Sequence, residues 1–276
     1  MKPVYVSASF DDLRSRHIRL LQEAARTGPV CVQLWDDDVV RAATGAEPKF
    51  PLAERRYFVE SMRFVAQVQP LAAADRGREA ELAVNQSVPG AAWFVDERTA
   101  NADDERLMRD SGGEYRVLSD AELAGFPEPT DVDGPQDAPP RSKVIVTGCY
   151  DWLHTGHVRF FEEVAELGEL YVVVGHDANV RQLKGPHHPL FPEQERRYMA
   201  GAIRFVRRAY VSSGDGWLDA EPEIALIRPD VYAVNEDGDR PEKRTFCERH
   251  GIKYHVLTRR PKPGLEGRSS TALRGF

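Results

Sequence analysis

Cysteine is scarce in this sequence, and its spacing forms no metal-binding or disulfide motif. The 276 residues hold three cysteines, Cys31, Cys149 and Cys247, which are widely spaced and form no CxxC pair. Neither a zinc ribbon nor a disulfide framework is therefore indicated. We interpret all three as small buried residues in a reducing cytosol.

Long apolar runs are also missing. No stretch approaches the ~20 apolar residues that a membrane-spanning helix requires. The first twelve residues, MKPVYVSASFDD, lack the long apolar core and the small-residue cleavage site of a secretory signal. We therefore expect a cytoplasmic protein with no membrane span.

Positive charge is in the minority. The chain has 37 Lys and Arg against 44 Asp and Glu, which gives a net charge of −7 and a pI near 5.7. This balance argues against nucleic acid as a partner, because nucleic-acid-binding domains usually carry a basic surface, although it leaves room for a local basic pocket. Disorder of the whole chain is excluded by a hydrophobic content of 41% and a charged content of 29%, which are ordinary for a folded protein.

The sequence contains two copies of one domain. Residues 140 positions apart are identical at many places, and the offset becomes 141 in the middle of the copy and 139 near its end. Matching residues at the three offsets include Asp11 with Asp151, His17 with His157, Phe50 with Phe191, Tyr57 with Tyr198, and Glu97 with Glu236. Identity this collinear is not chance, and it indicates an internal duplication.

A proline-rich segment separates the copies. Residues 127–141 hold five prolines and little that is apolar, a composition typical of an exposed, semi-stiff linker. We therefore expect one domain at 1–126 and a second at 142–276. In the second, apolar runs such as 143–148 alternate with helical patterns such as 157–167 and 192–206. Strands alternating with helices predict the α/β class, here two tandem Rossmann-like domains with doubly wound parallel sheets.

Two histidines follow the first strand of the second copy. Ligands of such sheets bind beyond the carboxyl ends of the strands, where this copy has His154, Gly156 and His157. The histidines can face one side of a helical turn, the glycine lets a ligand approach the backbone, and a helix N-terminus attracts anions. The pattern favours a phosphate site. Two histidines of the surface or core, and a two-ligand metal site, are the alternatives, and the metal is weakly supported.

These residues resemble the signature of the cytidylyltransferase family, the HxGH group of nucleotidyltransferases. The segment 146–157, VTGCYDWLHTGH, carries the resemblance, and further features follow in the family's order. They are Asp177 to Asn179, Lys184-Gly185, Glu195 to Tyr198, Ile203 to Val206, and the late segment Ser269 to Arg274. The resemblance spans 142–276 and is closest in pattern to the glycerol-3-phosphate, phosphocholine and phosphoethanolamine cytidylyltransferases.

The resemblance implies transfer of CMP from CTP to a small phosphorylated alcohol or phosphonate, with release of pyrophosphate. His154 and His157 would bind the α- and β-phosphates, and Lys184 would lie between the α-phosphate and the acceptor. A divalent cation, Mg²⁺, would bridge phosphate oxygens, and Asp151 is a candidate to order the turn or the hydrated metal. The other residues that the resemblance assigns to the nucleotide are Thr147, Gly148, Cys149, Tyr150, Asp151, Gly156, Asp177, Arg204, Glu236, Ser269, Ser270, Thr271 and Arg274.

The acceptor is not identified by the sequence. Trp217 and His187 are candidates to contact it. The alternative interpretation of Trp217 is a residue of the core. The family's arginine before the late segment corresponds to either Arg260 or Arg268. Two rival functions remain open: an adenylyltransferase that uses ATP at the same site, and a nucleotide-binding regulator without turnover. The intact Lys184 and late segment argue against the regulator.

The first copy has lost most of these residues. The exchanges, with the second-copy residue first, are Gly148 to Ala8, His154 to Arg14, Gly156 to Arg16, and Lys184 to Thr44, while His157 is retained as His17. We therefore expect the first domain to be inactive. Because single-domain relatives commonly form dimers, we expect it to act as an intramolecular replacement for the second subunit.

Overall fold

The chain folds into two separate units. A computed structural model describes residues 2–86, 90–128, 141–269 and 273. The division between the units falls after Phe126, so that they comprise residues 1–126 and 127–276. Among the described residues, no helix is long and apolar enough to cross a membrane.

The first unit alternates strands and helices. Its strands are β1 (Val4–Ala8), β2 (Val30–Trp35), β3 (Val65–Leu71), β4 (Ala92–Asp96) and β5 (Glu114–Leu118). Its helices are α1 (Ser15–Ala25), α2 (Asp37–Thr44), α3 (Leu52–Glu60), α4 (Glu79–Gln86) and α5 (Ala102–Asp110), with the short 3-10 helix η1 at Ala73–Asp75.

The second unit repeats this order. Its strands are β6 (Lys143–Gly148), β7 (Glu169–Val174), β8 (Val206–Val211), β9 (Val231–Asn235) and β10 (Lys253–Leu257). Its helices are α6 (Thr155–Ala165), α7 (Asp177–Lys184), α8 (Glu193–Gly201), α9 (Glu221–Ile227) and α10 (Pro241–His250), with 3-10 helices η2 (Gly216–Leu218) and η3 (Glu236–Gly238).

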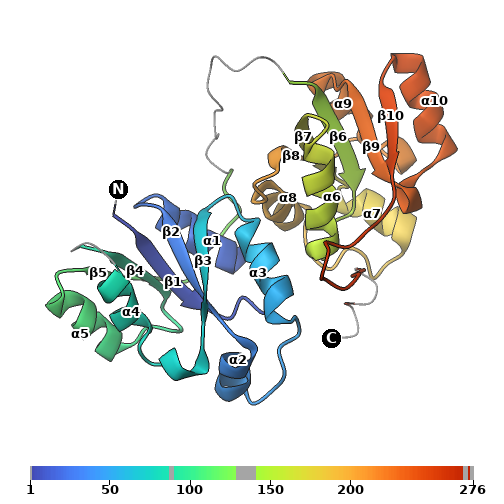
Figure 1. Cartoon of the computed structure of the whole chain (residues 1–276). Coiled ribbons are helices and arrows are strands. Elements are labelled where there is room, and N and C mark those ends of the chain that lie inside the picture. The colour runs from blue at the N-terminus through green and yellow to red at the C-terminus, as the bar shows by residue number, and fades with distance from the viewer. Residues whose placement is uncertain (1, 87–89, 129–140, 270–272, 274–276) are drawn as a thin grey trace. The chain divides into compact units, whose positions relative to one another are not determined.

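Both sheets have the same topology. The strand orders are β3-β2-β1-β4-β5 and β10-β9-β6-β7-β8, and every pairing is parallel. When the second sheet is read from β8 to β10, its strands follow the same order as those of the first sheet read from β3 to β5. Even the irregularity of register recurs, after Val30 in β2 and after Leu170 in β7. Each sheet lies between helices on both of its faces (Figure 1), so the expected class, two Rossmann-like α/β domains, is confirmed.

Apolar residues explain why these elements form and pack. The central strand β6 buries Val144, Ile145 and Val146 completely, as expected of a parallel strand that is covered on both faces. On one face, α9 and α10 contribute Ile224 and Phe246 to a cluster that includes Ile145. On the other, α6 presents an apolar stripe of fully buried residues, Val158, Phe161 and Val164.

One predicted helix is too long. The helix expected over 192–206 ends at Gly201, where Ala202 closes it by donating to the carbonyl of Tyr198. A tight turn from Ile203 to Val206 then leads directly into β8. The apolar residues after Gly201 suit a helix by periodicity, but the sheet uses Val206 as the start of a strand.

A buried arginine fixes the same loops in each unit. Arg196 of α8 is 1% exposed and donates to the carbonyls of Phe191, Cys149 and Gly175 and to the Asp177 carboxylate, at 2.7–2.9 Å. In the first unit, Arg55 of α3 is 2% exposed. It donates to the matching groups, which are the carbonyls of Phe50, Ser9 and Trp35 and the carboxylate of Asp37. The duplication therefore retains this arginine although the two sites have diverged.

Candidate functional site

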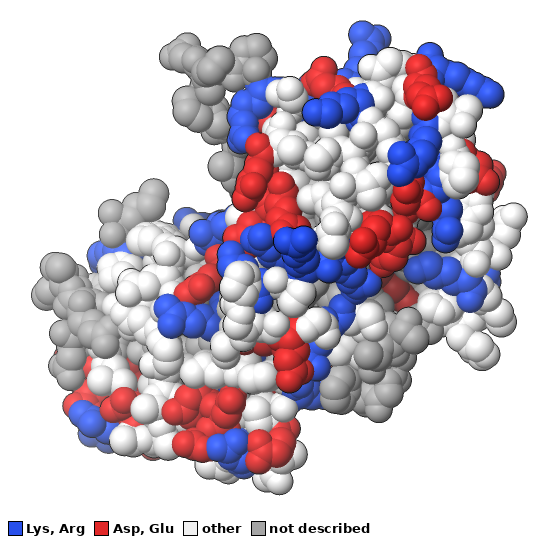
Figure 2. All heavy atoms as spheres, turned by 45° about the vertical axis from the view of Figure 1, so that its right-hand side comes forward, with Lys and Arg blue, Asp and Glu red and all other residues white. Residues whose placement is uncertain are grey.

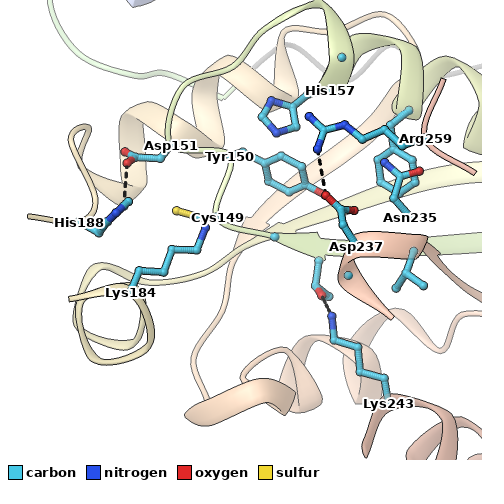
Figure 3. A pocket seen from close by; sticks show the side chains of 16 residues that line it. Cys149, Tyr150, Asp151, His157, Lys184, His188, Asn235, Asp237, Lys243 and Arg259 are labelled. Carbon is cyan, nitrogen blue, oxygen red and sulfur yellow. Dashed lines mark hydrogen bonds and ion pairs between the residues drawn. The ribbon is translucent and has the colours of Figure 1, made fainter. Parts of the chain in front are cut away.

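A pocket lies at the carboxyl ends of β6 and β9. These neighbouring strands mark the point from which the sheet order runs in opposite directions, which is where doubly wound sheets bind ligands. The pocket has a volume of about 190 Å³. It is lined by Thr147, Gly148, Cys149, Tyr150, Asp151, Gly156, His157, Phe160, Lys184, His188, Val234, Asn235, Asp237, Gly238, Lys243 and Arg259 (Figure 3).

The two histidines stack at the start of α6. Their ring centroids are 4.0 Å apart and their planes are inclined by 30°. His154 is the N-cap residue, and its Nδ1 accepts the backbone N–H of Gly156 at 3.1 Å. The ring of Tyr150 meets that of His157 edge-on, with centroids 5.2 Å apart. The imidazoles are therefore held at the helix end where free N–H groups favour an anion.

Both histidines are neutral at pH 7. Burial, together with the nearby charges of Arg259 and Arg268, lowers the pKa of His154 to about 3. Burial, His154 and Arg259 hold the pKa of His157 well below its usual value. Since the Nδ1 atom of His154 accepts a hydrogen bond, the proton of this neutral ring lies on Nε2.

Two nitrogen atoms of this pair lack a protein partner. Within the described part of the chain, the buried Nε2 of His154 and Nδ1 of His157 have no hydrogen-bond partner. The Oδ1 atom of Asn235, at the end of β9, is in the same situation. Buried polar atoms without partners are rare and call for an explanation, and a ligand is one.

Glycine is required between the histidines. A Cβ atom on Gly156 would lie 2.8 Å from the Cε1 of His154 and 3.3 Å from the carbonyl oxygen of Arg268. Gly148, at the end of β6, is equally restricted, because its Cβ would lie 2.9 Å from the ring of Tyr150. These two positions leave no room for a side chain beside the histidines.

Cations enter the pocket from three elements. Lys184 ends α7, Lys243 lies on α10, and Arg259 follows β10 (Figure 3). Arg259 forms a 2.9 Å ion pair with Asp237. On the face of each unit drawn in Figure 2, charges of both signs are interspersed. The net charge of −7 therefore coexists with a pocket that suits an anionic ligand.

Asp151 organises a loop. Its Oδ1 accepts the backbone N–H groups of Leu190 and Phe191 at 2.6 and 3.2 Å, and its Oδ2 lies 3.5 Å from the Nδ1 of His188. Asp11 accepts the two matching N–H groups in the first unit. Because a unit without the histidine pair keeps this contact, it belongs to the fold. The described residues hold no group of three or more His, Cys, Asp or Glu that could bind a metal ion.

The pocket gathers about half of the residues that the sequence analysis selected. Those that line it are Thr147, Gly148, Cys149, Tyr150, Asp151, Gly156, His157 and Lys184. His154 stacks behind them. Ser270, Thr271 and Arg274 lie outside the described residues.

The other selected residues lie beyond the pocket lining. Asp177 is paired with Arg196, and the backbone of Arg259 donates to Glu236 at 3.3 Å. Arg204 is exposed. Trp217 is 47% exposed, with the Arg240 guanidinium 4.8 Å from its ring centroid. Ser269 accepts the N–H of Leu273 on its backbone oxygen.

Several lining residues were not selected from the sequence. Arg259 lies in the pocket, whereas the two arginines that we considered, Arg260 and Arg268, do not line it. His188 lines the pocket beside His187, which is exposed. Asn235 and Lys243 were also missed. A polar residue at the carboxyl end of a strand, as at Asn235, is the signal that could have found one of them.

The matching place in the first unit is filled by its own side chains. Arg16, at the position of Gly156, forms ion pairs with Asp96 and Asp120, which match Asn235 and Arg259. The Arg98–Asp120 pair repeats the Asp237–Arg259 pair with its charges reversed. A guanidinium and two carboxylates thus replace the glycine and the polar atoms that line the second pocket.

Comparison with known proteins relates the second half to nucleotidyltransferases. The sequence model of a family described as cytidylyltransferase-like matches residues 145–275. The FAD synthase of Aciduliprofundum boonei is 37% identical over 118 residues, 42% of this chain and 76% of that protein. The FAD synthase of Ferroglobus placidus is 36% identical over 134 residues, 48% of this chain and 84% of that protein.

Two other similarities are narrower or more distant. The bifunctional protein HldE of Syntrophotalea carbinolica is 36% identical over 137 residues, 48% of this chain and 26% of that protein. A solved structure, the lipopolysaccharide core biosynthesis protein of Thermoplasma volcanium, is 26% identical with a TM-score of 0.38, and the match covers 44% of this chain and 98% of that one.

Proposed function

Because this chain belongs to the cytidylyltransferase-like family of nucleotidyltransferases, we propose that its second unit transfers AMP from ATP to a phosphate-type oxygen of a small anionic acceptor. The family membership rests on the match over 145–275 and on relatives that this chain covers by more than two thirds. The identities of the nucleotide and of the acceptor go beyond the family membership and are part of this proposal.

The relatives favour ATP over the CTP that the sequence motifs led us to prefer. FAD synthases are ATP-using adenylyltransferases, and HldE is an ADP-heptose synthase. CTP is thus the second candidate, supported by the family description and by the resemblance of the motifs. The cations that line the pocket suit a phosphomonoester or phosphonate as the acceptor here.

In the proposed reaction, an acceptor oxygen attacks the α-phosphorus of the nucleotide. The bond from that phosphorus to the α–β bridging oxygen breaks, and its electron pair leaves with pyrophosphate. Such a transfer needs mainly positioning and stabilisation of charge. The observation that carries the proposal is the neutral histidine pair with its unpartnered buried nitrogens. Nε2–H of His154 would donate to a phosphate oxygen and strengthen that bond as charge develops.

Lys184 and Arg259 would supply positive charge without proton transfer. Both line the pocket, and the triphosphate would compete with Asp237 for Arg259. Arginine forms strong, frequently bidentate hydrogen bonds with phosphate as well as with carboxylate. These two residues therefore act as fixed charges around the phosphates.

Mg²⁺ fits this site as a companion of the nucleotide. The protein offers no cluster of three ligands within its described residues, and Asp151 already accepts two backbone N–H groups. Mg²⁺ is commonly held by substrate phosphates with few carboxylates. When bound, it would neutralise part of the triphosphate charge, and Asp151 and Asp237 are the two carboxylates of the pocket lining that could contact it or its water.

A pyrophosphate-release assay tests the proposal. The purified full-length chain is given Mg²⁺ and either ATP or CTP, with FMN, a sugar phosphate, glycerol 3-phosphate, phosphoethanolamine and a hydroxyalkylphosphonate as acceptors. We expect turnover with at least one acceptor and a kcat/KM at least about tenfold higher with ATP, since one lost base contact costs about 1.4 kcal/mol or more. A preference for CTP would reverse the assignment of the base. Nucleotide binding without pyrophosphate release from any pair would support the regulator.

A further inference from the structure

We propose that Lys243 binds the anionic group of the acceptor and so determines that the acceptor carries a phosphate or phosphonate. This inference rests on the proposed function for the presence of an acceptor. It concerns a residue that none of the sequence motifs includes.

Lys243 is a buried cation that faces the pocket. It lies on α10, is 7% exposed and lines the pocket opposite the histidines. Its Nζ donates to the hydroxyl of Thr147 at 3.4 Å and lies 5.5 Å from the ring centroid of Tyr232. That hydroxyl is in turn 2.6 Å from the Tyr232 hydroxyl. No carboxylate of the described residues forms an ion pair with Lys243, so its direct contacts are with neutral groups.

Burying an ammonium group in this way is costly. Burial lowers the pKa of Lys243, and Asp219 and Asp239 oppose that effect from a distance. A buried charge is usually paired, because its desolvation is otherwise not repaid. A lysine that keeps three donors at the wall of a pocket, with one long hydrogen bond, is well placed to bind an anion that enters the pocket.

The position of Lys243 favours the acceptor over the triphosphate. In Figure 3, His157 and Arg259 lie together on one side of the end of β6, and Lys243 lies on the other side. Attacking and leaving oxygens stand roughly in line on opposite sides of the reacting phosphorus. With the triphosphate at the histidines and Arg259, the attacking group arrives from the side that Lys243 occupies.

The first unit shows that the fold does not need this lysine. The matching residue, 139 positions earlier, is Asp104 of α5. The helix and the parallel strands β4 and β5 are kept there, although the charge is reversed. Lys243 is thus present in the unit that has the histidine pair and is replaced in the unit that lacks it. This difference is expected if Lys243 binds a ligand.

The test separates nucleotide binding from anion binding. Lys243→Met keeps the length and packing of the side chain and removes its charge, and Lys253→Met, at an exposed residue of β10, is the matched control. Each full-length protein is titrated by calorimetry with α,β-methylene-ATP and then, when loaded with that nucleotide, with inorganic phosphate as the probe. We expect phosphate affinity to fall at least tenfold in Lys243→Met, nucleotide affinity to stay within threefold, and Lys253→Met to match the wild type.

Each other result is decisive. Unchanged phosphate affinity in Lys243→Met overturns the inference, and so does a tenfold loss of nucleotide affinity with phosphate binding retained. Thermal unfolding of Lys243→Met tests for a structural role of the lysine. We expect the melting temperature to stay or rise, because an apolar residue replaces a buried charge without an ion pair. A fall of the melting temperature together with both affinities would overturn the inference. Failure of the proposed function is distinct, since the wild type would then release no pyrophosphate with any pair of nucleotide and acceptor, and the phosphate titration would still report on Lys243.

Discussion

The smallest residue in the site fixes its geometry. A Cβ atom built on Gly156 would lie 2.8 Å from the Cε1 of His154 and 3.3 Å from the carbonyl oxygen of Arg268. Either the imidazole or the late segment has to move when a side chain is added. The two unpartnered histidine nitrogens are useful only if their positions are kept, because an error of about 1 Å in placement costs about 10²-fold in rate.

We therefore expect Gly156→Ala to lower kcat/KM for pyrophosphate release by about 10²-fold. Stability should change little, because alanine favours a helix over glycine by about 1 kcal/mol, which offsets part of the clash. Gly238→Ala is the control in the same pocket, as nothing lies within 4 Å of its Cβ position. Equal activity of the two variants would show that the spacing of the histidines does not matter.

The buried histidines also make stability depend on pH. The pKa of His154 is lowered from 6.5 to about 3 by burial, so the unfolded chain binds a proton between these values and the folded chain does not. The stabilisation is complete above pH 6.5 and is lost as the pH falls towards 3. We expect the free energy of unfolding to fall by up to about 1.4 kcal/mol per pH unit for this group.

Urea unfolding of the wild type and of His154→Gln between pH 7.5 and 4.5 measures this effect. The variant should lose stability less steeply with falling pH, because one of the two buried imidazoles is gone. Parallel curves for the two proteins would contradict the assignment of a neutral, buried His154.

Residues near each other in sequence could be predicted, and those joined only by the fold could not. The segment 146–157 could be recognised from the sequence, since the strand end, the histidines, the glycine and the start of the helix lie within twelve residues. Arg259, which follows β10, and Lys243, on α10, reach the pocket only because β9 pairs with β6 across the sheet. No local pattern distinguishes Lys243 from a solvated lysine on a helix.

At the scale of elements, the alternation of strands and helices was readable, and the end of α8 was not. Apolar β-branched runs gave the strands, and Gly251 ends α10 in the left-handed conformation, as glycine readily does. The end of α8 was missed because the residues that follow it are as apolar as a helix face, although the sheet takes them into β8. The loops between these elements are held in both units by the buried arginines, Arg55 and Arg196.

We expect Arg55→Met to destabilise the first unit by about 3–5 kcal/mol, since it leaves three carbonyls and the Asp37 carboxylate without their buried partner. The neighbouring Arg56→Met removes only an exposed pair with Glu60 and should cost less than about 1 kcal/mol. Urea unfolding followed by circular dichroism measures both. Similar small losses in the two variants would mean that Arg55 is not the residue that holds these loops together.

At the scale of the molecule, duplication has produced two units with one topology and two different sites. The second unit keeps an open pocket with unpartnered polar atoms, and the first has Arg16 bound between Asp96 and Asp120 in the matching place. We propose that the first unit does not catalyse the reaction. Restoring it would require at least a glycine at position 16, a histidine at position 14 and a lysine at position 44.

The central claim is that one nucleotidyltransferase site, that of His154 and His157, accounts for all of the turnover. The most direct test is pyrophosphate release from ATP by the full-length double variant His154→Ala, His157→Ala, with the best acceptor of the panel and circular dichroism as the check of folding. We expect a loss of at least about 10³-fold, because loss of a single preorganised donor to developing charge already costs about 10²–10³. Turnover above a tenth of the wild-type rate in the folded variant would contradict the account and place activity elsewhere in the chain.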